Sequence, residues 1–207
     1  MRLDKFLTEL GIGTRSEVKK ILKTGQVTVN GIPVKKPETK IDECNDKVLY
    51  QGQLLQYQQF EYYLFHKPAG CVTAVTDDMH KTVMDYMRDL TRKDLFPVGR
   101  LDIDTEGLLL ITNDGALSHE LLSPAKHVPK TYYAKIEGLV TKEDVNAFAK
   151  GVDIKEDKPT KPAILKILVS DTFSEIELTI TEGKFHQVKR MFEAVDKKVV
   201  YLKRISM

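Results

Sequence analysis

The N-terminal part of the chain alternates apolar and polar residues with the spacing of two short helices. Apolar residues separated by three or four positions predict the first helix, which the glycines at positions 11 and 13 end: Leu3, Phe6, Leu7 and Leu10. A capping-box pair, Thr14 and Glu17, predicts the start of the second helix. Its apolar stripe, formed by Val18, Ile21 and Leu22, ends before Gly25. The order helix, tight turn, helix is therefore expected within the first 25 residues.

The next segment has the pattern of a β-hairpin. Two β-prone runs, at residues 26–29 and 32–34, flank the dipeptide Asn30-Gly31. Asn-Gly suits the two central positions of a tight hairpin turn, because both residues tolerate a positive φ. We therefore expect a compact helix-helix-hairpin unit.

From residue 61 onward the chain is dominated by short runs with the composition of strands. The predicted strands are Tyr62–His66, Tyr132–Ile136, Ala163–Val169 and Ser174–Thr181. Helical patterns lie between them, at Lys81–Leu90, His119–Leu122, Thr141–Lys150 and His186–Ala194. The third and fourth strands are separated only by a short turn, so at least part of the sheet is antiparallel. The fold class is α+β, with a small helical and hairpin domain followed by a mixed, largely antiparallel sheet.

Length and composition exclude several classes of protein. The chain has 207 residues, of which 42% are hydrophobic and 30% charged, as in ordinary globular proteins. Its two cysteines, Cys44 and Cys71, do not form a disulfide framework. We see neither a secretion signal nor an apolar run long enough to span a bilayer, so a cytoplasmic protein without membrane association is expected.

Charge is unevenly distributed along the chain. The net charge is only +2, but residues 1–36 carry 8 basic and 3 acidic side chains, and residues 184–207 carry 7 basic and 2 acidic ones. Two basic segments around a nearly neutral middle indicate an extended anionic partner such as nucleic acid.

The N-terminal unit resembles the S4 RNA-binding domain in the order of its elements, over roughly residues 1–48. The resemblance implies that one cationic face binds the phosphates of structured RNA. The residues of this face are Arg2, Lys5, Arg15, Lys19, Lys20 and Lys23. A helical face that is merely solvated is the alternative. The Gln-rich stretch around residues 51–59 then marks a boundary, giving domains 1–58 and 59–207.

One segment of the second domain carries candidate chemistry. The string from Val98 to Gly115 places Asp102 and Asp104 in a polar loop ahead of the apolar run Leu108–Ile111, which is expected to be a strand. A loop held by a buried strand can position a catalytic group rigidly. In isolation, an Asp-x-Asp pair would be interpreted as an Asx-turn.

The whole string resembles the active-site motif of the RsuA-type rRNA pseudouridine synthases. Other segments match motifs of that family in the same order: His66–Gly70, Lys130–Ala134, Glu182–Met191 and Leu202–Ile205. The resemblance covers essentially the whole chain. It implies isomerisation of a uridine, in which the N1–C1′ bond breaks and the uracil is rejoined through C5, without a metal or other cofactor.

The resemblance also implies roles for individual residues. Asp102 is the catalytic residue, and the sequence leaves open whether it attacks C1′ or C6 or removes a ribose proton. The flipped base stacks on Tyr132. Lys189 pairs with Asp102 and keeps it ionised, with Arg190 as the alternative partner. Arg100 and Arg190 are expected to contact phosphate or the flipped nucleotide, and Lys67 is expected at the rim of the pocket. His186 is expected to form hydrogen bonds to RNA or within the fold.

The resemblance favours the small-subunit branch of the family, so the expected substrate is uridine 516 of 16S rRNA, in naked rRNA or in the assembling small subunit. We expect the enzyme to act as a monomer. Two alternatives stay open: a 23S rRNA pseudouridine synthase, and a non-catalytic protein that binds rRNA through its S4 domain.

Overall fold

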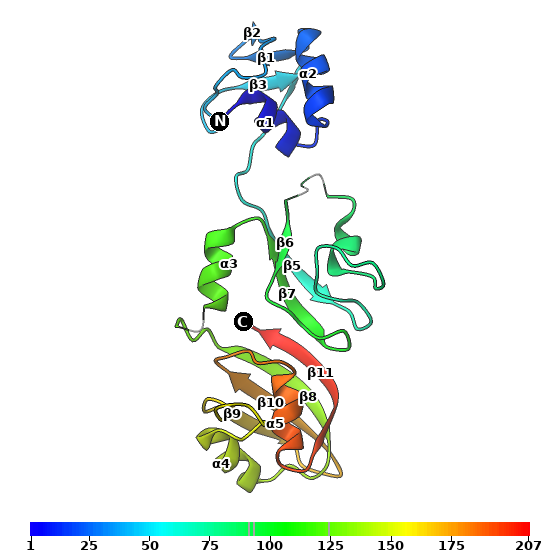
Figure 1. Ribbon diagram of the computed structural model, residues 1–207, viewed down its shortest axis with the longest axis vertical. Coiled ribbons are helices and arrows are strands. Elements are labelled where there is room, and N and C mark those ends of the chain that lie inside the picture. Colours follow the sequence, from blue (N-terminus) through cyan, green and yellow to red (C-terminus); the bar gives the residue numbers. More distant parts are fainter. Residues whose placement is uncertain (91, 93, 124) are drawn as a thin grey trace. The chain divides into compact units, whose positions relative to one another are not determined.

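The computed structural model describes residues 1–90, 92, 94–123 and 125–207. The chain forms two compact units (Figure 1). The first consists of Met1–Glu61 and Met87–Leu95, and the second of Tyr62–Tyr86 and Phe96–Met207. The boundary expected between residues 58 and 59 stays a prediction. Within the described residues, no helix combines the length and the apolar character that crossing a bilayer requires.

The first unit contains the predicted helices and hairpin. Helix α1 (Leu3–Glu9) is followed by α2 (Arg15–Lys23), whose capping box is present: Glu17 accepts a hydrogen bond from the Thr14 amide at 2.8 Å, and Thr14 Oγ1 accepts one from the Glu17 amide. Strands β1 (Val27–Val29) and β2 (Ile32–Pro33) pair across the predicted turn, where Asn30 has a φ of 51° and Gly31 a φ of 82°. These predictions are confirmed.

A second hairpin of this unit was not predicted. Strands β3 (Val48–Tyr50) and β4 (Gln53–Leu54) extend the sheet to the order β2-β1-β3-β4. The start of the Gln-rich stretch is the turn of this hairpin, with both Gln51 and Gly52 at positive φ. The apolar faces of the helices and sheet enclose one core, which includes Leu3, Phe6, Val18, Leu22 and Val48.

The second unit is built on a seven-stranded mixed sheet. Its strands are β5 (Tyr62–Lys67), β6 (Phe96–Val98), β7 (Glu106–Thr112), β8 (Lys130–Glu137), β9 (Ile164–Val169), β10 (Phe173–Ile180) and β11 (Lys198–Ser206). The order is β5-β7-β11-β8-β10-β9, with β6 also paired to β7. All neighbours are antiparallel except β7 and β11, which are parallel. The α+β class with a mixed, largely antiparallel sheet is therefore confirmed.

Helices α4 (Lys142–Lys150) and α5 (Gln187–Glu193) pack with the strands from β8 onward, and α3 (Gly115–Leu122) follows β7 (Figure 1). The rings of Phe148 in α4 and Phe192 in α5 meet edge to face, with centroids 5.0 Å apart, in the main core. This packing fixes α5 against the sheet, which matters because α5 carries one of the predicted site residues.

The helix expected at Lys81–Leu90 is wrong in extent. Only a 3₁₀ turn, η1 (Val83–Met87), forms there. Val83 is its one fully buried apolar side chain, packed with Cys71 and Leu109. A longer amphipathic helix needs a continuous buried stripe to stabilise it, and this segment lacks one.

Candidate active site

The loop that carries Asp102 connects β6 to β7 and is fastened from both sides by hydrogen bonds. Thr73 Oγ1 donates to the Leu101 carbonyl at 2.8 Å and accepts from the Leu101 amide at 3.1 Å. The Gly70 amide donates to the Ile103 carbonyl at 2.7 Å. Asp102 therefore sits between two anchored neighbours, which restricts the positions that its carboxylate can take.

Lys67 provides a third anchor for this loop from within the protein. Its ammonium group is fully buried and donates to the carbonyls of Pro68, Ile103 and Thr105 at 3.1, 3.2 and 2.9 Å. Burial lowers the pKa of Lys67, while nearby acidic groups oppose that effect. The side chain was expected at the rim of the substrate pocket, but it is not among the residues that line the cavity. Two of its three hydrogen bonds go to Ile103 and Thr105 in the loop of Asp102, so the buried ammonium group helps to anchor that loop.

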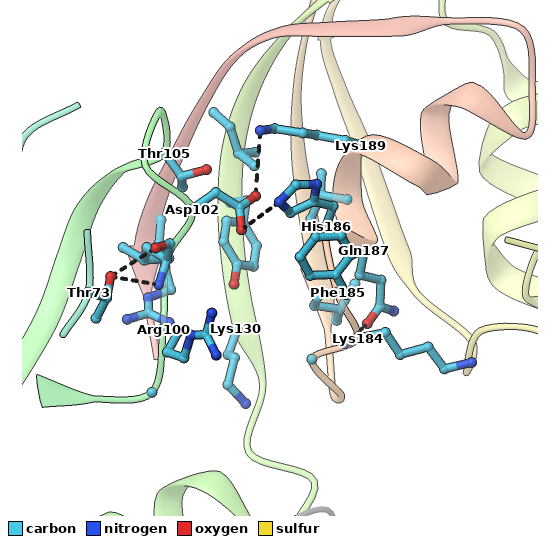
Figure 2. Close-up of a pocket in the computed structure, with 18 of the residues that line it drawn as sticks. Thr73, Arg100, Asp102, Thr105, Lys130, Lys184, Phe185, His186, Gln187 and Lys189 are labelled. Atoms are coloured by element: carbon cyan, nitrogen blue, oxygen red, sulfur yellow. Dashed lines mark hydrogen bonds and ion pairs between the residues drawn. The ribbon is translucent and has the colours of Figure 1, made fainter. Parts of the chain in front are cut away.

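Asp102 meets two basic side chains from the segment around α5 (Figure 2). Lys189 Nζ lies 3.5 Å from Asp102 Oδ2, and His186 Nε2 lies 3.6 Å from Asp102 Oδ1. Asp102, in the loop between β6 and β7, and Lys189, in α5, therefore lie next to each other as expected. His186 precedes α5 with a φ of 48°, and its ring stacks on that of Phe185 with centroids 3.8 Å apart.

The shortest contacts of Lys189 are made with Asp104 rather than with Asp102. Lys189 Nζ lies 2.7 and 2.8 Å from the two carboxylate oxygens of Asp104. Burial favours the neutral form of Asp104, but the hydrogen bond and charge of Lys189 outweigh it and lower the pKa of this carboxyl. Lys189 therefore bridges two carboxylates, a point that the motif alone did not indicate.

Arg190 is not available as the alternative partner of Asp102. Its guanidinium group binds Glu156 at 2.5 Å and also donates to the carbonyls of Ile154 and Phe185. Successive residues of a helix point in directions about 100° apart, so Lys189 and Arg190 face different surroundings. Arg190 lies outside the cavity lining and ties α5 to the segment at residues 154–156.

A cavity of about 890 Å³ opens beside Asp102. Tyr132, on β8, lines it and is only 8% exposed. Burial raises the pKa of Tyr132, which keeps its hydroxyl protonated, and the positive charge of Arg204 opposes part of that rise. Arg100 lines the same cavity as an exposed side chain, and its contact to phosphate or to the flipped nucleotide stays a prediction. The cavity thus combines a carboxylate, an aromatic face and cationic groups.

Sequence reasoning missed three cations that line this cavity: Arg204 on β11, Lys130 at the start of β8 and Lys184 ahead of α5. Arg204 is 2% exposed. Burial lowers the pKa of Lys130, and the charge of Arg204 adds to that effect. The sequence does contain an indication for Arg204: it follows the apolar Leu202 by two positions, and residues two apart in a strand lie on the same face of the sheet.

The predicted RNA-binding residues of the first unit all lie exposed. Arg2 pairs with Asp4 at 2.8 Å and Lys5 with Glu9 at 3.6 Å, so two of the six charges are partly neutralised. The four others belong to α2 and form no ion pair with any described residue: Arg15, Lys19, Lys20 and Lys23. The cationic surface is therefore concentrated on α2.

Two family models match the chain. The S4 domain model matches residues 1–48, and the RNA pseudouridylate synthase model matches residues 61–194. A solved structure described as a pseudouridylate synthase has 38% identity and a TM-score of 0.66, covering 99% of this chain and 87% of the other.

Curated relatives are similar to this chain over 84–87% of their own length. The uncharacterized RNA pseudouridine synthase YtzG of Bacillus subtilis is 46% identical, covering 100% of this chain and 87% of the relative. Ribosomal large subunit pseudouridine synthase B of B. subtilis is 37% identical over 98% and 84% of the two chains. Ribosomal small subunit pseudouridine synthase A of Escherichia coli is 41% identical over 99% and 87%. The chain belongs to the RNA pseudouridylate synthase family and joins an S4 domain to that catalytic domain.

Proposed function

We propose that the protein converts a uridine of ribosomal RNA to pseudouridine, with Asp102 as the catalytic carboxylate and uridine 516 of 16S rRNA as the target. The observation that carries the proposal is the place of Asp102, on an anchored loop at the wall of an 890 Å³ cavity, 3.5 Å from Lys189. The ion pair with Lys189 holds the carboxylate at the cavity wall, where nucleophilic or basic chemistry needs it.

The cavity fits a base that has left its helix. A uridine stacked or paired in rRNA is out of reach, so it must be flipped into the site. The ring of Tyr132, buried in the cavity wall, offers a flat face for the uracil. Its hydroxyl can donate a hydrogen bond or a proton, and burial, which raises the pKa of Tyr132 above its ordinary value, further favours the protonated form.

The proposed RNA contact outside the cavity is the exposed face of α2. Its four cations have no carboxylate partner within the described chain, so phosphate groups would meet little competition. Changing Lys19, Lys20 and Lys23 to Ala should weaken RNA binding for all sequences. It should also flatten the salt dependence by about one slope unit for each phosphate that is no longer bound. An unchanged salt slope would contradict this face.

Pseudouridine mapping of rRNA tests the proposal in cells that lack the gene. Complementation with the native protein should restore one pseudouridine, and complementation with Asp102→Asn should not, although this variant should bind RNA with nearly native affinity. Restoration at position 516 of 16S rRNA supports the proposed target. The 37% identity to a large-subunit synthase makes a 23S position the second candidate, and the same map would identify it. Full restoration by Asp102→Asn would refute catalysis at this residue.

A further inference from the structure

Two side-chain atoms of the second unit are buried without a hydrogen-bond partner among the described residues. They are Oγ1 of Thr105 and Nη2 of Arg204. Both residues line the active-site cavity, and they are 1% and 2% exposed. Most buried polar atoms in folded proteins are paired, so two unpaired atoms in one cavity indicate a ligand that supplies the missing partners.

The guanidinium of Arg204 is fixed at the cavity by its own strand. Arg204 stands opposite Tyr132 in the antiparallel pairing of β11 with β8, which places the two side chains on the same face of the sheet. On the other side, Arg204 Nε donates to the Leu108 carbonyl of β7 at 2.8 Å. Nε thus holds the group in place, and a side-chain hydrogen bond of the guanidinium to Tyr132 partly offsets the rise in the pKa of that phenol. Nη2 has no hydrogen-bond partner among the described residues and is the nitrogen left for a ligand.

No ion pair neutralises Arg204 within the part of the chain that the structure describes. Lys189 has Asp102 and Asp104, and Arg190 has Glu156. A buried guanidinium with an unused donor is costly for the free protein, and an oxygen acceptor from a ligand removes that cost.

We propose that Nη2 of Arg204 binds a carbonyl oxygen of the flipped uracil and stabilises the negative charge that the ring acquires during isomerisation. This inference rests on the proposed function. When the N1–C1′ bond breaks, its electron pair stays with the uracil and is shared by N1, O2 and O4. The C5–C1′ bond then forms, C5 loses a proton and N1 gains one. A fixed cation beside O2 or O4 is worth most when that charge develops.

The depth of Arg204 favours the base over a phosphate as its ligand. Phosphates of RNA stay in contact with water at the mouth of a pocket, where the exposed Arg100 is available to them. Arg204 is 2% exposed and borders Tyr132, which is the proposed stacking partner of the uracil. A uracil stacked on Tyr132 would bring its carbonyl oxygens within reach of this guanidinium.

The test combines Arg204→Gln with sulfur substitution in the RNA. A synthetic rRNA fragment carries uridine, 2-thiouridine or 4-thiouridine at the mapped target, and single-turnover rates and RNA affinities are measured. Arg204→Gln should slow the native fragment by about 10²–10³-fold, with affinity changed less than about threefold. Sulfur accepts hydrogen bonds weakly, so the thio-substitution at the oxygen that Arg204 binds should slow the native enzyme. Arg204→Gln lacks the guanidinium donor, so the same substitution should slow it about five- to tenfold less.

Lys203→Gln is the matched control, because it removes a charge from the next position of β11, on the opposite face of the sheet. It should leave both thio effects unchanged. If Arg204→Gln does not fold, as judged by its thermal transition, Arg204→Lys takes its place. That variant keeps the charge but lacks the planar fork, and should lose rate by at least about tenfold together with the oxygen-specific thio effect.

Three results would overturn the inference: a native-like rate in the Arg204 variants, thio effects equal to those of the native enzyme, or a loss confined to RNA affinity with a salt slope lowered by about one. The last result would identify a phosphate as the ligand. If the proposed function itself is wrong, the native protein will form no pseudouridine in any fragment. This result differs from all three results that contradict only the role of Arg204.

Discussion

Replacing Gly107 with Ala should destabilise the catalytic unit at the seam between β7 and β11. Gly107 has a φ of 103°, and a Cβ built there would lie 2.1 Å from the carbonyl oxygen and 2.8 Å from the amide nitrogen of Arg204. Since real Cβ contacts are essentially never under 3.0 Å, the two strands must separate by roughly 1 Å. The parallel pairing has only two register pairs, Lys203 to Glu106 and Arg204 to Gly107, so a separation at Gly107 disrupts half of it.

The expected loss is about 3–5 kcal/mol, combining overpacking with the strain of a positive φ. In a protein of this size it corresponds to a fall of roughly 6–20 °C in the melting temperature, which circular dichroism would record. Gly115→Ala is the matched control: it begins α3, has no atom within 4 Å of the added Cβ, and should melt no lower than the native protein. A Gly107→Ala melting temperature within about 2 °C of native would refute the close approach.

Three further predictions concern charges near the site. Asp104→Asn should leave Asp102 as the only carboxylate that pairs with Lys189, and the single-turnover rate should change by less than about tenfold. A larger loss would show that Asp104 is itself required. Lys67→Met should cost about 2–4 kcal/mol in urea unfolding and also slow catalysis, because three carbonyls lose their donor; native stability would contradict the anchoring role. Burial and a hydrogen bond to a carboxylate raise the pKa of Tyr201 to about 12, from 10.0, so folding favours its protonated form. Tyr201→Phe should therefore lower stability by about 1–2 kcal/mol below pH 10, and the difference from native should vanish between pH 10 and about 12; a pH-independent difference would argue against the hydrogen bond.

The parts of the fold that sequence reasoning could predict depend on interactions between near neighbours. The capping box of Thr14 and Glu17 lies within one helical turn, and the Asn30-Gly31 hairpin depends on the backbone freedom of two residues. The helix prediction at residues 81–90 was wrong because it depends on contacts that are distant in the sequence. Whether this segment continues as a helix is decided by its packing partners, and only Val83 finds a fully buried place.

The sequence motifs predicted those parts of the site in which two motif residues are direct neighbours in the structure. Asp102 and Lys189 were expected to meet, and their atoms are 3.5 Å apart. The bridge from Lys189 to Asp104 and the pairing of Arg190 with Glu156 depend on side-chain directions that no motif specifies. The place of Arg204 beside Tyr132 depends on strand register, because its neighbours in β7 and β8 are about 95 and 70 residues away in sequence.

The position of β11 has a consequence for the time at which an active enzyme appears. This strand is made after every other strand of its sheet, yet it lies between β7 and β8. At about 5–20 residues per second, roughly 5–20 s pass on the ribosome between the synthesis of β7 and that of β11. Until then β8, and the part of β7 that β5 and β6 leave unpaired, present open edges to which other chains could pair. Activity should therefore arise in one late step, and slow translation of this interval should increase aggregation.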